Sequence, residues 1–152
     1  MNLYEGMFLL DNQVVRADWK SAKNLVADLV KKNGGEVSTI RRWDERRLAY
    51  AIRGRRRGTY YLTYFKAAPE AITAIRHDFE LEERVLRYLV LRVETLPETE
   101  VELAKAELVE GYTVPPPPSD DEPLPVEEPV AVVEEAPAEI VEEVPSEAGT
   151  EA

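Results

Sequence analysis

Eight arginines and four tyrosines lie between positions 41 and 64 of the sequence. A guanidinium group meets phosphate oxygens with paired hydrogen bonds and stacks on flat rings, and tyrosine rings offer faces on which bases stack. The residues are Arg41, Arg42, Arg46, Arg47, Arg53, Arg55, Arg56 and Arg57, with Tyr50, Tyr60, Tyr61 and Tyr64. This combination predicts a surface that binds RNA. The alternative is a solvated basic face paired with carboxylates of the same chain, for which only Asp44 and Glu45 are local candidates.

The sequence offers little for catalysis or for metal binding. It contains no cysteine, and its single histidine, His77, falls outside the apolar stripe formed by Ile72, Ile75 and Phe79. A histidine off that stripe is expected to be solvated. No glycine-rich phosphate loop follows a predicted strand in the patterns of nucleotide-binding proteins. We therefore expect no enzymatic activity, no metal and no cofactor.

Charge divides the chain into two unequal parts. Residues 1–95 contain 18 Lys and Arg against 13 Asp and Glu, a net charge of +5, whereas residues 96–152 contain one Lys against 17 acidic residues, a net charge of −16. Ten of the eleven prolines also lie in the second part. This asymmetry predicts a basic domain over residues 1–95 and an acidic Pro/Glu-rich tail over residues 96–152. We expect the tail to be mostly disordered, from about Gly111, after a transient helix over Val101–Glu110.

The N-terminal residues and the hydropathy of the chain bear on where the protein works. Residues 1–13 lack the basic flank and the apolar run of a signal peptide. No stretch approaches the roughly 20 apolar residues that span a bilayer. These features predict a soluble cytoplasmic protein that has no membrane partner.

Hydrophobic periodicity predicts six elements in the first 95 residues. Alternating and β-branched runs indicate strands, and apolar residues at helical spacing indicate helices. They are a strand over Leu3–Leu10, a helix over Arg16–Asn33, a strand over Glu36–Arg53 interrupted at Trp43-Asp44, a strand over Thr59–Ala67, a helix opening at Pro69 and a strand over Glu83–Glu94, with a basic turn over Gly54–Gly58. This βαββαβ order predicts an α+β, ferredoxin-like domain, whose four-stranded antiparallel sheet carries both helices on one face.

The other face of that sheet is expected to carry apolar groups. In the last strand, Val85, Leu89 and Leu91 point to one side together with Arg87, and the opposite side also holds apolar residues. An antiparallel sheet covered on one face normally alternates apolar and polar residues. Scattered surface hydrophobes are common, but a contiguous patch marks a binding surface, which we favour here.

Short motifs over residues 1–95 resemble one family, the sixth protein of the bacterial small ribosomal subunit. The motifs are Tyr4-Glu5, Trp43 followed by R-R-L-A-Y-A-I (Arg46–Ile52), Gly58-x-Tyr60, and F-x-L-x-x-x-V-L-R-x-L-V-L-R (Phe79–Arg92). Two positions depart from the family pattern, since Ala51 replaces a usual proline and Asp44 a usual glycine. Neither departure removes an arginine.

The resemblance implies a structural, ribosomal role without catalysis. Members bind small-subunit ribosomal RNA jointly with the eighteenth protein of that subunit, and a variable acidic C-terminal tail fits the family. By resemblance, Tyr4, Tyr60 and Arg87 belong to the surface that faces RNA or the partner, with Leu89 and Leu91 as apolar partner contacts.

Two alternatives stay open at this point. The stretch Arg57–Tyr64 partly matches the third-strand signature of RRM-type single-stranded RNA binders. That reading turns Thr59 and Tyr61 outward, whereas the ribosomal resemblance turns Tyr60 outward. The second alternative is a ferredoxin-like enzyme that uses an arginine, against which the absence of a ligand-sized pocket beside an arginine would count.

Overall fold

The computed structural model describes residues 1–109, 112 and 114–119. Its elements occur in the predicted order, followed by one further helix. They are β1 (Asn2–Asp11), α1 (Asn12–Ala17), α2 (Trp19–Lys32), β2 (Glu36–Ile52), β3 (Arg55–Ala67), α3 (Ala71–Leu81), β4 (Val85–Val93) and α4 (Glu98–Ala106).

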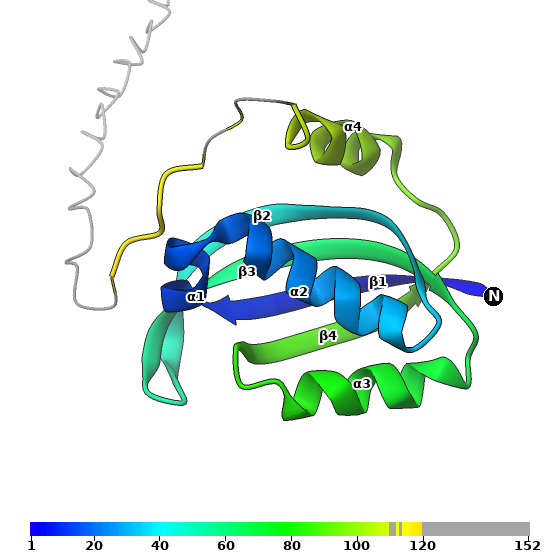
Figure 1. The fold of residues 1–152 in the computed structure, drawn as a ribbon, viewed down its shortest axis with the longest axis horizontal. Coiled ribbons are helices and arrows are strands. Elements are labelled where there is room, and N and C mark those ends of the chain that lie inside the picture. The colour runs from blue at the N-terminus through cyan, green and yellow to red at the C-terminus, as the bar shows by residue number, and fades with distance from the viewer. Residues whose placement is uncertain (110–111, 113, 120–152) are drawn as a thin grey trace, which may run out of the picture. The chain divides into compact units, whose positions relative to one another are not determined.

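The four strands form one antiparallel sheet in the order β2-β3-β1-β4, and α2 and α3 cover one of its faces (Figure 1). The core lies between this face and the helices. Its fully buried side chains include Phe8, Leu10, Val26, Val30, Tyr61, Phe65, Ile75, Phe79 and Val85. The ferredoxin-like α+β fold is therefore confirmed, and we call the sheet face opposite α2 and α3 the open face.

The first predicted helix is two helices in the structure. Asp18 separates α1 from α2 with an extended backbone (φ −161°, ψ 103°), and its carboxylate accepts a hydrogen bond of 2.9 Å from the backbone N–H of Lys20. Asp11 caps α1 in the same way, through the N–H of Gln13. The prediction missed the break because an aspartate between two apolar turns keeps the helical spacing, yet its side chain stabilises a new helix start.

The predicted turn over Gly54–Gly58 is wrong, because the chain reverses at Arg53 and Gly54 alone. Both residues have positive φ, 48° and 77°, as a two-residue turn of type I′ requires, and Ile52 pairs with Arg55 across it. The segment 55–58 therefore continues β3. We call residues 46–57 the hairpin arm. The predicted interruption at Trp43-Asp44 is confirmed by a register shift between Arg42 and Asp44.

An irregularity also changes the side on which one residue of β4 lies. The register between β1 and β4 shifts at Leu9/Leu10, so that Leu9 pairs with Arg87 and Leu10 with Val85. Val85 consequently lies in the core and not beside Leu89, as strict alternation had predicted. Beyond the shift, Leu89 stands on the open face, as predicted.

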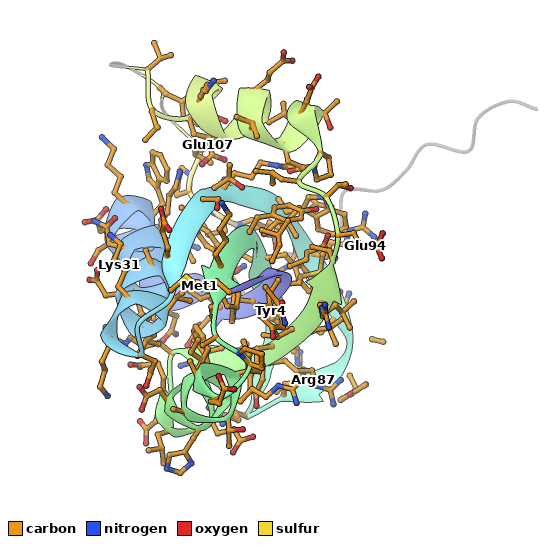
Figure 2. The ribbon with its side chains drawn as sticks, turned by 90° about the vertical axis from the view of Figure 1, so that its right-hand side faces the viewer. Met1, Tyr4, Lys31, Arg87, Glu94 and Glu107 are labelled. Atoms are coloured by element: carbon orange, nitrogen blue, oxygen red, sulfur yellow. The ribbon has the colours of Figure 1, made fainter. Side chains whose placement is uncertain are left out.

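Helix α4 lies along the edge strand β2 (Figure 1) and begins three residues earlier than the helix predicted at Val101–Glu110. Glu107, just after α4, accepts a hydrogen bond of 2.8 Å from the backbone N–H of Arg42 and pairs with the Lys23 ammonium at 2.8 Å. Figure 2 shows Glu107 on the side of α4 that faces the sheet. We call residues 98–109, 112 and 114–119 the C-terminal strap.

The later part of the C-terminal strap also contacts the sheet and the first two helices. The Tyr112 ring packs edge-on against Trp19, with 6.1 Å between ring centres. The Pro118 carbonyl accepts a hydrogen bond of 3.3 Å from the Asn12 amide. Most of the tail predicted to be disordered from Gly111 lies outside the described residues. Whether residues 1–95 fold without the C-terminal strap stays a prediction.

Candidate nucleic-acid interface

The structure separates the eight predicted arginines by their partners. Arg41 donates from two nitrogens to the two carboxylate oxygens of Glu100 in α4, one of these bonds being 2.9 Å. Both side chains are largely buried, and the hydrogen bond to Glu100 raises the pKa of Arg41. The guanidinium of Arg41 is thus neutralised within the chain.

Arg42 is also engaged by the C-terminal strap. Its side chain donates to the Pro115 carbonyl at 3.4 Å, and its backbone N–H donates to Glu107. An edge strand otherwise presents such backbone groups to other chains. The C-terminal strap therefore satisfies an edge position of β2 and holds the Arg42 side chain over the α1–α2 junction.

Arg57 lies inside the molecule. It is 6% exposed, and its guanidinium is 3.4 Å from the Glu45 carboxylate. The same carboxylate accepts a hydrogen bond from Asn12, whose amide oxygen accepts one from the Thr59 hydroxyl. The prediction that Arg57 contacts phosphate from the surface is wrong, because Arg57 belongs to this buried polar network.

Other arginines of the hairpin arm are solvent-accessible. Arg46 pairs with Asp44 at 2.6 Å, which lowers the pKa of that carboxyl, and lies over the Trp43 ring at 5.5 Å. Arg53 donates to the carbonyls of Glu83 and Val85, each at 3.3 Å, and so ties the arm to the start of β4.

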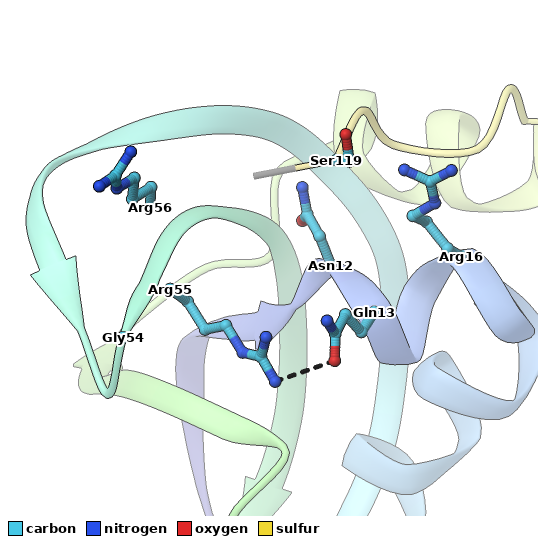
Figure 3. Close-up of a pocket in the computed structure, with 7 residues that line it drawn as sticks. All are labelled: Asn12, Gln13, Arg16, Gly54, Arg55, Arg56 and Ser119. Atoms are coloured by element: carbon cyan, nitrogen blue, oxygen red, sulfur yellow. Dashed lines mark hydrogen bonds between the residues drawn. The ribbon is translucent and has the colours of Figure 1, made fainter. Parts of the chain in front are cut away.

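Arg47 and Arg56 are the least engaged members of the predicted set. Both side chains are exposed, and neither makes an ion pair or hydrogen bond within the part of the chain that the structure describes. Arg55 is half-buried and contacts Asp11 and Gln13. Figure 3 shows that Arg55 and Arg56 share a cavity with Arg16 of α1. Sequence reasoning missed Arg16, because only the fold brings α1 beside the arm.

The open face carries the predicted apolar partner residues. Leu89 and Leu91 are 54% and 48% exposed. A groove of about 330 Å³ runs between the hairpin arm and β1 and β4, and Leu9, Leu48, Tyr60 and Leu89 are among its lining residues. Arg46, Arg47 and Arg87 border the same groove, and the Arg87 guanidinium lies 5.6 Å from the centre of the Tyr50 ring.

Strand phase decides between the two readings of β3. Tyr61 is fully buried on the helix-covered face, where its hydroxyl donates to the Trp19 carbonyl at 3.1 Å. Tyr60 is half-buried on the opposite, open face and lines the groove. The outward placement of Tyr60 is confirmed. The RRM-type reading is wrong in its phase, because its stacking ring would have to be Tyr61.

The observed environments of Tyr4 and Tyr64 differ from the expected ones. Tyr4 is 7% exposed and stacks on Phe65 in the core, with 5.7 Å between ring centres. Its predicted place on a surface that faces RNA or a partner is wrong. Tyr64 is buried on the open face, and its hydroxyl donates to Glu5 at 2.6 Å. Burial, followed by this hydrogen bond, raises the pKa of Tyr64.

The described residues contain no group of three or more His, Cys, Asp or Glu side chains that could hold a metal ion. None of the helices in that same part of the chain is long and apolar enough to cross a membrane. The cavity beside Arg55 and Arg56 does meet the geometric condition set for a ferredoxin-like enzyme. Geometry alone therefore does not exclude the ferredoxin-like enzyme.

Fold and site together define a ferredoxin-like protein with a basic arm and an apolar open face, a combination suited to binding. Comparison with known proteins points to one family. A family model described as Ribosomal protein S6 matches residues 3–92, and the chain belongs to this family.

Relatives of this chain agree with that assignment. Small ribosomal subunit protein bS6 of Helicobacter hepaticus is 35% identical over 98 residues, which are 64% of this chain and 72% of that protein. The bS6 protein of Rhodopirellula baltica is 36% identical over 94 residues, 62% of this chain and 67% of that protein. The crystal structure of 30S ribosomal protein S6 from Thermotoga maritima shares the fold, with a TM-score of 0.54 and 19% identity over 70% of this chain and 94% of that chain.

Family membership fixes the broad role. The chain is a structural, non-enzymatic component of the small ribosomal subunit, and its association with RNA and with translation follows from that role. The enzyme alternative is thereby rejected. The exposed arginines and the apolar groove are the parts of the surface that this role has to explain.

Proposed function

We propose that the chain binds small-subunit ribosomal RNA together with the eighteenth protein of that subunit, in the cytoplasm. One observation carries the proposal. Arginines and an exposed leucine border a single groove on the open face, where Arg47 and Arg87 lie beside Leu89. A surface with both an apolar floor and a cationic rim suits a ribonucleoprotein contact, because protein packs on the floor and phosphate meets the rim.

The RNA-facing set differs from the one expected from sequence. Arg41, Arg42 and Arg57 have partners inside the chain, so they contribute little to a phosphate surface. The remaining candidates are Arg46, Arg47, Arg53, Arg55, Arg56 and Arg87. Tyr60 supplies a half-buried ring to the groove that Arg46, Arg47 and Arg87 border.

The protein-facing set consists of the exposed leucines of β4. Leu89 and Leu91 stand two residues apart on one strand and therefore on the same face. Leu89 pairs with Met7 across the strand boundary, and Met7 lines the same groove. Covering these side chains with a partner removes apolar surface from water, which stabilises the complex.

The test is to replace Leu89 by aspartate and to measure binding of the eighteenth protein by calorimetry. An aspartate carboxylate in an apolar contact costs its hydration, so we expect the affinity to fall by at least about tenfold, or 1.4 kcal/mol. Leu81→Asp is the matched control, because Leu81 is 67% exposed on α3. Equal affinities of the two variants would show that the partner binds elsewhere.

A further inference from the structure

Three segments that are distant in sequence line one cavity of about 520 Å³ beside the hairpin arm (Figure 3). The start of α1 supplies Asn12, Gln13 and Arg16. The arm supplies Gly54, Arg55 and Arg56, and the C-terminal strap supplies Ser119. We call this space the arginine cavity. Neither the motifs nor the predicted arginine set pointed to it, because Arg16 and Ser119 lie far from the arm in sequence.

The side chains at the arginine cavity are held so that donors remain for a ligand. The Nε atom of Arg55 forms an ion pair with the Asp11 carboxylate at 2.9 Å, and its Nη2 donates a hydrogen bond of 2.9 Å to the Gln13 side-chain oxygen. Because the Gln13 oxygen accepts from Arg55, the two hydrogens of its amide nitrogen are left as donors. Asp11 is itself fixed by capping α1. The Arg55 fork is therefore anchored at two points before any ligand arrives.

Among the residues that the structure describes, positive charge exceeds negative charge at the arginine cavity. Arg16 and Arg56 are exposed and have no ion pair or hydrogen bond among the described residues, and Asp11 balances only Arg55. Asn12 adds no acceptor, since its oxygen already accepts from Thr59 and its nitrogen donates to Glu45 and to Pro118. Cations that share a cavity repel one another, and a bound anion relieves that repulsion.

We propose that the arginine cavity binds a phosphate group of the RNA backbone, a contact that rests on the proposed binding of small-subunit RNA. Arg16 and Arg56 meet the phosphate oxygens from opposite segments, while the anchored Arg55 and the Gln13 amide complete the donor set. Guanidinium groups suit this task because they present paired donors to phosphate. A site built from α1, the arm and the C-terminal strap fixes the orientation of the RNA relative to the sheet.

The proposal is tested with the full chain carrying Arg16→Gln and Arg56→Gln together. Both side chains are exposed, so the variant is expected to fold, which circular dichroism checks. Binding of small-subunit RNA is measured from low to moderate salt. Loss of the contacts to this phosphate should weaken binding about tenfold or more and reduce the slope of log affinity against log salt by about 0.7 to 0.9.

The control variant carries Lys31→Gln and Arg92→Gln, which remove the same charge from exposed positions outside the cavity. Arg92 pairs with Tyr4, whereas Gly58, the residue next to the arm, pairs with Asp11, so Arg92 lies at the other end of the sheet. We expect the control variant to keep a slope of log affinity against log salt near that of the unaltered chain. Equal slopes for the two double variants would overturn the cavity proposal and leave RNA binding itself intact.

Inorganic phosphate is the second probe, because the same donors could take a free ion. Thermal unfolding is compared in phosphate and in chloride at equal ionic strength. Stabilisation by phosphate that the Arg16/Arg56 variant loses, with unchanged RNA slopes, would assign the cavity to a free ion and overturn the RNA contact. An unaltered chain that does not bind small-subunit RNA would overturn both this inference and the proposed function.

Discussion

Two pairs of arginines lie five residues apart in the same strand and have different surroundings. Arg41 and Arg42 are half-buried beside the C-terminal strap, which engages both. Arg46 and Arg47 are exposed on the hairpin arm, where Arg46 pairs with the half-buried Asp44 and Arg47 borders the apolar groove. Residue type and strand are the same, so the surrounding chain decides which arginines can meet an external phosphate.

The difference arises from contacts that span most of the domain. Glu100, the partner of Arg41, lies 59 residues further along the chain, and Glu107 lies 84 residues beyond Lys23. Counting local carboxylates overestimates the free positive charge of such a strand. The alternative of a basic face paired within the chain is therefore correct for Arg41 and Arg57, and the binding interpretation remains for the exposed arginines of the arm.

The largest expected effect concerns the attachment of the C-terminal strap. Replacing Glu107 by alanine leaves the Lys23 ammonium, 10% exposed at its side chain, without its carboxylate and leaves the Arg42 backbone N–H unpaired. A buried charge without its partner costs about 3 kcal/mol. We expect urea denaturation to show a loss of that order. Glu102→Ala, at an exposed position of α4, should change the free energy of unfolding by less than about 0.5 kcal/mol.

The next prediction compares the two arginine pairs directly. Arg46→Gln with Arg47→Gln should weaken binding to small-subunit RNA roughly tenfold and lower the salt slope by about 1.5, because two phosphate contacts disappear. Arg41→Gln with Arg42→Gln removes the same charge from side chains engaged by the C-terminal strap. That variant should keep the slope of the unaltered chain within error. A larger change for the second pair would reverse the comparison drawn between them.

Hydrophobic periodicity predicted the strands of the sheet and their order along the chain, but not the details that long-range contacts impose. The element order followed from patterns within single segments, such as Ile72, Ile75 and Phe79 of α3. The side on which Val85 lies depends on a register shift against β1, which β4 alone does not encode.

Local sequence also accounts for part of the candidate site. The basic hairpin was evident because its arginines are neighbours in the chain. The arginine cavity was not, because Arg16, Arg55 and Ser119 meet only after α1, the arm and the C-terminal strap have packed. Tyr4 was misplaced for a related reason, since a tyrosine near the end of a strand has no local signal that separates the core from the surface.

A smaller effect on RNA binding and on stability is expected when the C-terminal strap loses a single ion pair. Glu100→Gln leaves Arg41 with a neutral partner, so the guanidinium becomes available to other anions. We expect small-subunit RNA to bind up to a few times more tightly, with a salt slope steeper by at most about one. Stability should fall by about 1 kcal/mol, because both side chains are largely buried and keep one neutral hydrogen bond. Unchanged RNA binding would place Arg41 outside the RNA contact even when it is released.

The smallest effect should come from the acidic residues that follow Ser119. Residues 120–152 contain twelve Asp and Glu and no Lys or Arg. A tethered anionic segment competes with non-specific nucleic acid for exposed arginines, and counter-ions weaken that competition because the Debye length is only about 8 Å at physiological salt.

A chain ending at Ser119 keeps α4 and its contacts, so the comparison isolates the charge. At low salt, we expect this shortened chain to bind random RNA a few times more tightly than the full chain does. At roughly physiological salt, about 0.15 M, we expect the two affinities to be equal. Binding to small-subunit RNA with the eighteenth protein present should change less, since ordered contacts displace the tethered carboxylates. Equal affinities for random RNA at every salt concentration would show that these residues solubilise the chain without touching the arm.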